Sequence, residues 1–291
     1  MIMIKTYIVM KNRLFMALMF GFLLVGQSLW AGNWKAKHVV LIGLDGWGAY
    51  SVEKAEMPNV KRLMAEGSYT LKKRSVLPSS SAVNWASMYM GAGPELHGYT
   101  EWGSKVPELP SRVTNDHGIF PTVFSLLREA APKAEIGTIY EWDGIRYVVD
   151  TLAMNYEKHV TDKPEVSRAT ARYAAEYIKR ARPALLNIVF DEPDHVGHEK
   201  GHDTADYYRK LAELDGYVGQ ILQAIDEAGI REETIVIVTA DHGGIEKGHG
   251  GKTMMEMPFF RRSTPPSRTA VRSSRGLVRP TTMGSRERMT A

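Results

Sequence analysis

Four short apolar runs limit this chain to a small number of folds. They occupy residues 38–44, 134–140, 184–190 and 234–240, and each is rich in aliphatic or β-branched residues with little polar alternation. Such runs are typical of strands buried on both faces of a parallel sheet, because a strand with one solvated face alternates polar and apolar residues. Helix-like patterns separate the runs. The sequence therefore predicts an α/β fold with a mostly parallel central sheet and helices on both of its faces.

The helix-like patterns occupy residues 57–66, 82–91, 121–131, 165–182 and 204–229. In the last of them, apolar residues from Leu211 to Ile225 recur at steps of three and four, which gives the helix one apolar face. Residues 92–120 are rich in Gly and Pro and lack periodicity, so we expect them to form a surface beside the substrate site.

The N-terminal segment has the composition of a signal peptide. Three basic residues come first, an apolar run of suitable length follows, and Ala31 offers a small residue at the cleavage point. We therefore expect an exported protein, periplasmic or extracellular, with no membrane span after cleavage; an uncleaved N-terminal anchor is the alternative. The chain has no cysteine, so it has neither disulfides nor a lipid-bearing Cys.

The C-terminal segment differs from the rest of the chain. Residues 261–291 combine Pro, Ser and Thr with eight Arg and one Glu and show almost no apolar periodicity, so we expect them to remain unfolded. The change in composition is abrupt, and our hypothesis is a shifted reading frame or a truncation. The predicted organisation is a signal peptide at 1–31, a catalytic domain at 32–260 and an Arg-rich disordered tail at 261–291.

The two ends also account for the basic character of the chain. The net charge of the whole chain is +4. Residues 261–291 contribute +7 and the leader contributes +3, so residues 32–260 have a net charge of −6. We therefore expect no nucleic-acid-binding module in the catalytic domain; a tail that binds phosphate backbones is the alternative.

Acidic and histidine side chains follow three of the four apolar runs. They are Asp45 after the first run, Asp194 and His198 after the third, and Asp241 and His242 after the fourth, with His249 further on between glycines. Ligands of open α/β sheets bind beyond the carboxyl ends of the strands, so these residues are candidates for one common site. Mixed carboxylate and imidazole ligands favour Zn²⁺, with Mn²⁺ second. Six ligands suit two divalent metal ions better than one ion with an open position.

Three consecutive serines precede the helix expected at 82–91. They are Ser79, Ser80 and Ser81. A hydroxyl is a poor nucleophile at neutral pH, but coordination to a metal ion favours its alkoxide without a neighbouring base. The N-terminus of a helix also attracts an anion. A metal-activated serine at a helix N-terminus, with a second metal nearby, indicates phosphoryl transfer.

These motifs resemble those of the alkaline phosphatase superfamily and, within it, of the type I phosphodiesterase/nucleotide pyrophosphatase family. The matching segments, in the order of the family, are "GLDG" at 43–46, "PSSSAVN" at 78–84, "DEPDHVGH" at 191–198, "ADHGG" at 240–244 and "GHGG" at 248–251. The resemblance extends from residue 39 to about residue 260. It implies an alkaline-phosphatase-like fold and an exported hydrolase of phosphodiester or phosphoanhydride bonds, acting on a nucleotide or another small phosphorylated compound.

The resemblance also implies a role for each motif residue. Ser81 would be the nucleophile and form a phosphoseryl intermediate, and Asn84 would hydrogen-bond the phosphoryl oxygens. The metal that activates Ser81 would be held by Asp45, Asp241 and His242. The metal that steadies the leaving oxygen and later activates water would be held by Asp194, His198 and His249.

The sequence departs from the family pattern at two places. Val83 stands where the family usually has proline, and the Arg-rich tail stands where the family's fold continues with a further strand and helix. We therefore expect the sheet to be incomplete at its C-terminal end. Two alternatives stay open: a phosphomonoesterase or phosphonate hydrolase of the same superfamily, and a truncated, non-catalytic relative that binds metal or phosphate. A sulfatase is disfavoured, since the chain has no Cys and no Ser-x-Pro-x-Arg arrangement around the serines.

Residues outside the motifs have weaker signals. We expect His202 to lie on a solvated loop, and His97 to be a structural loop histidine. Trp102 and Trp142 lie near the predicted strand ends and could stack on a base or another leaving group; a place in the core or at its rim is the alternative.

Overall fold

The structure is a computed structural model that describes residues 36–264, with side chains up to residue 257. The predicted leader and residues 265–291 lie outside the described residues.

The seven strands of the described chain are β1 (His38–Leu44), β2 (Ser68–Arg74), β3 (Ile136–Tyr140), β4 (Tyr156–His159), β5 (Leu185–Phe190), β6 (Thr234–Thr239) and β7 (Pro258–Thr264). They form one sheet with the order β2-β7-β6-β1-β5-β3-β4. The five strands from β6 to β4 in this order run parallel to one another, and β7 runs antiparallel to both β2 and β6. The predicted mostly parallel sheet is confirmed.

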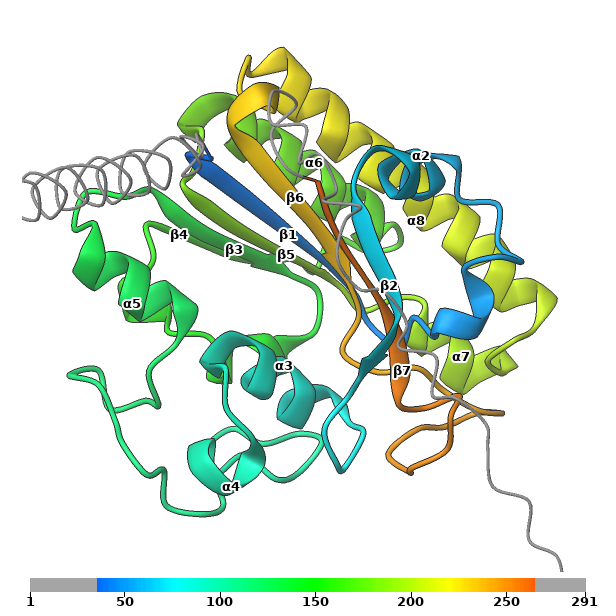
Figure 1. Cartoon of the computed structure of the whole chain (residues 1–291), viewed down its shortest axis with the longest axis horizontal. Helices are drawn as coiled ribbons and strands as arrows, with labels where there is room; N and C mark the ends of the chain where they lie inside the picture. Colours follow the sequence, from blue (N-terminus) through cyan, green and yellow to red (C-terminus); the bar gives the residue numbers. More distant parts are fainter. Residues whose placement is uncertain (1–35, 265–291) are drawn as a thin grey trace, which may run out of the picture.

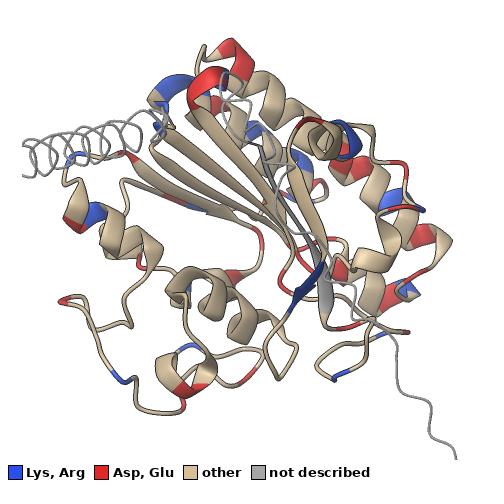
Figure 2. Cartoon of the chain, in the orientation of Figure 1, with Lys and Arg blue, Asp and Glu red and all other residues tan. Residues whose placement is uncertain are grey.

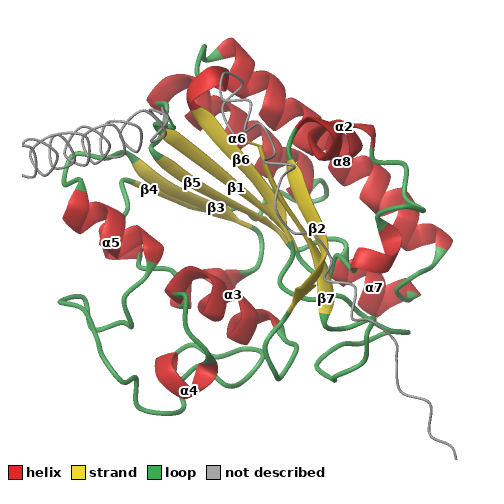
Figure 3. Ribbon diagram, in the orientation of Figure 1, coloured by secondary structure: helices red, strands yellow, loops and turns green. Residues whose placement is uncertain are grey.

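Helices cover both faces of the sheet, as predicted (Figures 1 and 3). The helices are α2 (Pro58–Glu66), α3 (Ser81–Met90), α4 (Pro94–His97), α5 (Val123–Ala130), α6 (Val166–Ala181), α7 (Asp194–Lys200) and α8 (Ala205–Glu227), and the 3₁₀ helices are Ala49–Ser51, Asp143–Tyr147, Thr151–Ala153 and Arg231–Glu233. Helices α3 and α5 lie on one face, and α2, α6 and α8 lie on the other.

The central strands are buried from both sides. In β1, Val40, Ile42 and Leu44 belong to the core beneath α2, α6 and α8, whereas Val39 and Leu41 pack against the core beneath α3 and α5. Strands β1, β3, β5 and β6 contain no Lys, Arg, Asp or Glu, and Figure 2 shows the charged residues mostly on the surrounding helices and loops. Burial on two faces explains why these runs are apolar throughout rather than alternating.

Strand β7 crosses the domain boundary predicted from composition. It lies between β2 and β6, and its residues 261–264 belong to the segment predicted to be an unfolded tail. Strands pair through main-chain N–H and C=O groups, which nearly every residue type supplies, so the Arg-rich composition does not reveal the pairing. In the described part of the chain, no helix is both long enough and apolar enough to span a bilayer.

Candidate metal centre

The carboxyl ends of β1, β5 and β6 bring the predicted residues to one edge of the sheet. Strand β1 pairs with β5 on one side and with β6 on the other, so the residues that follow the three strands are neighbours. The backbone N–H of Asp45 donates to the carbonyl of Phe190 over 3.0 Å, and the N–H of Asp194 donates to the carbonyl of Asp45 over 3.1 Å. The turns that follow β1 and β5 are therefore hydrogen-bonded to each other.

The first cluster consists of Asp45, Asp241 and His242. Their ligand atoms lie within 4.8 Å of one another and all three residues are buried. His242 Nε2 lies 3.4 Å from Asp45 Oδ1 and 3.3 Å from Asp241 Oδ2, and neither carboxylate oxygen accepts a hydrogen bond. The other oxygen of each carboxylate is occupied: Trp85 Nε1 donates to Asp45 Oδ2 over 3.1 Å, and the N–H of Gly46 donates to Asp241 Oδ1 over 3.2 Å. One oxygen of each carboxylate is thus held, and the other faces His242.

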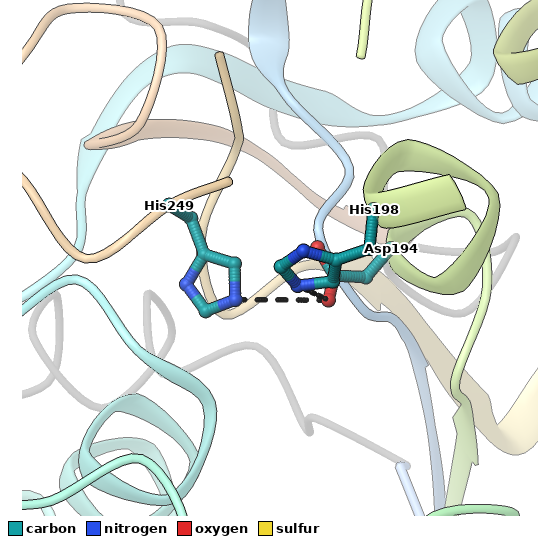
Figure 4. A group of neighbouring side chains, drawn as sticks. All are labelled: Asp194, His198 and His249. Atoms are coloured by element: carbon teal, nitrogen blue, oxygen red, sulfur yellow. Dashed lines mark ion pairs between the residues drawn. The ribbon is translucent and has the colours of Figure 1, made fainter. Parts of the chain in front are cut away.

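The second cluster consists of Asp194, His198 and His249 (Figure 4). His198 Nε2 lies 3.0 Å from Asp194 Oδ2, and His249 Nε2 lies 3.7 Å from the same oxygen. Asp194 and His198 are one turn apart on α7, as their spacing predicts. The rings of His249 and His242 are stacked with centroids 3.7 Å apart, so the two clusters are adjacent.

The three histidines share one orientation. The Nδ1 atoms of His198, His242 and His249 lie 2.9, 2.8 and 2.9 Å from the backbone carbonyls of Lys247, Gly243 and Ser79. A carbonyl only accepts, so each Nδ1 carries a hydrogen and each ring turns its Nε2 toward the carboxylates, where a deprotonated Nε2 could bind a metal ion. In the first cluster the Nε2 of His242 faces carboxylate oxygens, whereas in the second cluster the Nε2 of His198 lies at hydrogen-bonding distance from Asp194 Oδ2. This donor set fits divalent metal ions, with one carboxylate and two imidazoles in one cluster and two carboxylates and one imidazole in the other.

Burial determines the ionisation of the first cluster. Burial, followed by repulsion from Asp241 and Asp194, raises the pKa of Asp45 well above its ordinary value. Burial and the charge of Asp194 do the same to the pKa of Asp241. Burial and the neighbouring His249 lower the pKa of His242 to about 3, so its ring is neutral near pH 7. Positive charge between these groups would stabilise the ionised carboxylates.

In the second cluster, hydrogen bonds rather than burial determine the pKa values of Asp194 and His198. Burial acts to raise the pKa of Asp194, but hydrogen bonds with His198 and His202 outweigh it and hold the pKa well below its ordinary value. The hydrogen bond with Asp194 raises the pKa of His198 to about 9.

Of the three serines, Ser81 is the one whose hydroxyl contacts a cluster residue. It is the first residue of α3, and its Oγ lies 3.2 Å from His242 Nε2. Ser80 is the extended residue before the helix, although its side chain makes no capping hydrogen bond. The Ser79 hydroxyl is bound to the Ser75 hydroxyl and to the carbonyl of Glu256. The Ser79 hydroxyl therefore has structural partners, whereas the buried Ser80 hydroxyl has no hydrogen-bond partner among the described residues.

Asn84 makes its side-chain hydrogen bonds within the segment that precedes α3. Its Oδ1 accepts from the N–H of Val76 over 2.8 Å, and its Nδ2 donates to the carbonyls of Ser80 and Pro78 over 3.0 and 3.3 Å. The side chain is buried, and both ends of its amide are bound to the segment that precedes α3. Asn84 therefore holds the segment that leads to Ser81, and its implied contact with phosphoryl oxygens stays a prediction.

The prediction that His202 lies on a solvated loop is wrong. Its side chain is completely buried, and its Nε2 lies 3.2 Å from Asp194 Oδ1. A signal was present in the sequence, since Asp194, His198 and His202 recur at intervals of four residues. His97, in α4, is also buried. Its Nε2 lies 2.9 Å from the Ser87 hydroxyl, as expected for a structural histidine.

Two tryptophans lie next to the start of α3. The N–H of Ala82 donates to the carbonyl of Trp102 over 3.2 Å, and the rings of Trp102 and Trp142 are stacked with centroids 6.5 Å apart. Trp102 is 67% exposed, so it belongs to the rim rather than to the core.

The profile of the type I phosphodiesterase / nucleotide pyrophosphatase family matches residues 39–249. The chain belongs to this family. Ectonucleotide pyrophosphatase/phosphodiesterase family member 3 of Rattus norvegicus is 25% identical over 215 residues, which cover 70% of this chain and 24% of the relative. The chain spans between about a quarter and about half of the length of the curated relatives that it matches.

Solved structures share the fold. An inactive variant of murine ectonucleotide pyrophosphatase / phosphodiesterase 5 in complex with AMP superposes with a TM-score of 0.59 at 18% identity, covering 72% of this chain and 57% of that one. A putative sulfatase from Bacteroides thetaiotaomicron superposes with a TM-score of 0.66 at 12% identity, covering 79% and 64%. Both likenesses establish the α/β architecture, which hydrolases with different substrates share.

Proposed function

We propose that this chain hydrolyses phosphodiester or phosphoanhydride bonds, with Ser81 as the nucleophile beside two divalent metal ions, Zn²⁺ in preference to Mn²⁺. The observation that carries the proposal is the common orientation of His198, His242 and His249. Each ring gives its Nδ1 hydrogen to a carbonyl and turns Nε2 toward carboxylate oxygens. Membership of the family supports the reaction class.

Each cluster has its own part in the proposed reaction. Asp45, Asp241 and His242 would hold the ion beside Ser81, and the second cluster would hold the other ion. When bound, the two ions lower the pKa of a coordinated hydroxyl or water and neutralise charge on the attacking and leaving oxygens. The N-terminus of α3 favours the negative phosphoryl group next to Ser81.

The residues then act in two displacements. In the first, Ser81 Oγ forms a bond to phosphorus while the bond to the leaving oxygen breaks, which gives a phosphoseryl intermediate. In the second, water attacks the same phosphorus and the Ser81 oxygen leaves, which releases the phosphorylated product and restores the serine. With metal bound, the histidine rings would be neutral and would stay oriented by their carbonyl partners throughout.

We infer the substrate class and the location from the same family membership. The rat relative is named as an ectonucleotide enzyme, which supports nucleotides or similar phosphodiesters as substrates and an exported location for this chain. The predicted leader at residues 1–31 agrees with export to the periplasm or the outside of the cell.

The test measures bound metal and turnover on the full chain. We expect two zinc ions per chain and faster hydrolysis of an aryl phosphodiester than of the matching monoester. Both a chelator and Ser81→Ala should abolish turnover, the latter by at least about 10³-fold. Ser80→Ala is the matched control, because it removes a neighbouring buried hydroxyl that contacts neither cluster.

Three outcomes contradict the proposal in different ways. Faster hydrolysis of monoesters would make the protein a phosphatase. A chain with neither metal nor turnover would be a non-catalytic relative. Full activity in Ser81→Ala would remove the serine from the mechanism and leave the metal centre to activate water directly.

A further inference from the structure

We propose that His202 is a positioning residue for Asp194: it donates its Nε2 hydrogen to Oδ1 and so leaves Oδ2 for the metal ion shared with His198 and His249. The inference rests on the proposed function, because it takes Asp194 as a metal ligand. It concerns a residue that lies outside both clusters.

The two oxygens of Asp194 have different neighbours. Oδ2 faces His198 Nε2 at 3.0 Å and His249 Nε2 at 3.7 Å, whereas Oδ1 faces His202 Nε2 at 3.2 Å. The carboxylate therefore has one oxygen toward the candidate metal position and the other toward a fully buried ring. A hydrogen bond to the outer oxygen of a ligating carboxylate fixes its rotation and its basicity.

The hydrogen-bond partners of His202 favour a hydrogen on Nε2. The ionised oxygen Oδ1 can only accept, so the contact is favourable only if Nε2 donates. The other ring nitrogen, Nδ1, lies 3.2 Å from the carbonyl of Glu246, which also accepts the backbone N–H of His202 over 2.6 Å and has a second lone pair. Of the two acceptors, the ionised Asp194 oxygen is the stronger, because a hydrogen bond to a charged group is roughly twice as strong as a neutral one, so a ring hydrogen is favoured on Nε2.

The protein also leaves room for this ring between two ligand-bearing segments. A Cβ atom on Gly197 would come within 2.3 Å of the His202 ring, and a Cβ atom on Gly244 would come equally close. Gly197 lies on α7 between Asp194 and His198, and Gly244 follows His242 in the loop after β6. The ring therefore fills the space between α7 and that loop, where a shift would change the position of both clusters.

The experiment compares zinc affinities of the full chain by competition with a chelator. His202→Leu keeps much of the volume but removes the donor, whereas His202→Gln keeps a donor near the position of Nε2. We expect His202→Leu to lose about 10- to 100-fold in affinity for one of the two zinc ions, with the other less affected. His202→Gln should bind both ions within a few-fold of the wild-type affinity.

His97→Leu is the matched control, because His97 is an equally buried histidine that contacts neither cluster. It should lower the free energy of unfolding without changing zinc affinity. Wild-type affinities in His202→Leu, or an equal loss in His97→Leu, would overturn the inference. An equal loss in His202→Gln and His202→Leu would overturn it as well, since the donor would then be irrelevant.

A second measurement covers the case in which His202→Leu does not fold. Nitrogen-15 NMR of the wild-type chain should find the His202 hydrogen on Nε2, and a hydrogen on Nδ1 alone would overturn the inference. A wild-type chain that binds fewer than two zinc ions would instead contradict the proposed function. The same NMR measurement on that chain would still decide whether His202 donates to Asp194.

Discussion

The backbone N–H of Asp194 donates to the carbonyl of Asp45, so the leading residue of one cluster is bound to the leading residue of the other. The two segments are also in close contact at Gly46, which has a φ of +68° and lies so near that a Cβ atom would come within 2.5 Å of Asp194 Oδ1. The spacing of the two candidate metal positions is therefore built into the backbone, as well as into the ligand side chains.

Gly46→Ala should weaken zinc binding as well as lower the stability of the protein, because it adds a steric clash to the backbone strain. A non-glycine residue in the left-handed region costs about 1–3 kcal/mol, and here the added methyl group also displaces Asp194. Gly229→Ala is the matched control, because Gly229 has a φ of +70° and open space around its Cβ position. Both variants should lose stability in denaturant titrations, and Gly46→Ala alone should lose zinc. Normal zinc affinity in Gly46→Ala would contradict the close contact.

Zinc affinity should rise with pH. Burial raises the pKa of Asp45 and of Asp241, and the hydrogen bond with Asp194 raises the pKa of His198 to about 9, so the metal-free chain keeps extra protons near pH 7. A metal ion must displace those protons, which become easier to remove as the pH approaches 9. Titration calorimetry in buffers of different ionisation enthalpy measures the protons released. An affinity that is constant between pH 6 and 8 would show that these groups are not ligands.

Asn84→Ala should destabilise the protein through the segment before Ser81. The substitution leaves the N–H of Val76 and the carbonyl of Ser80 without their side-chain partner, at a cost of about 1–3 kcal/mol for buried groups. Thermal unfolding and steady-state kinetics distinguish the two roles of this residue. A lower kcat with unchanged stability would support the contact with phosphoryl oxygens that the family resemblance implies, rather than the structural role.

Trp102→Ala should weaken the binding of aromatic leaving groups without unfolding the protein. The ring is mostly exposed and stacks on Trp142 beside the start of α3, so its loss removes little buried surface. Stacking of a base on an aromatic side chain contributes about 1–3 kcal/mol, which corresponds to a rise in KM of roughly 5- to 150-fold. A substrate with a small alkyl leaving group serves as the comparison. An equal rise in KM for aryl and alkyl substrates would instead show that Trp102 stabilises the conformation of its own loop.

Periodicity predicted the central part of the fold well because burial on both faces leaves a strong trace in the sequence. The four apolar runs coincide with β1, β3, β5 and β6 to within two residues at each end. Strand β4 and strand β7 left no such trace. Strand β4 has only four residues and is partly exposed, and β7 is held by main-chain pairing on both sides.

The candidate site was predictable where residue type and position in the fold agree. Acidic and histidine residues after buried strands predict a shared edge, and the two clusters of the structure contain those six residues. The environment of Asn84 was not predictable from local pattern, because its partner Val76 lies 8 residues earlier in the sequence. The contact of His202 with Asp194 also spans 8 residues, and its one signal in the sequence is the spacing of four residues that links Asp194, His198 and His202. Asn84 binds a segment that folds back on α3, and His202 reaches Asp194 from beyond the end of α7.

The position of β7 gives the sheet an order of assembly. Every candidate ligand lies between Asp45 and His249, so all of them leave the ribosome before residues 258–264. Among the described strands, β2 pairs with β7 alone, and β7 also pairs with β6. A nascent chain can thus complete its parallel strands while β2 still has no place in the sheet. Strand β2 can therefore pair with its neighbour only after every candidate ligand of the metal centre has been made.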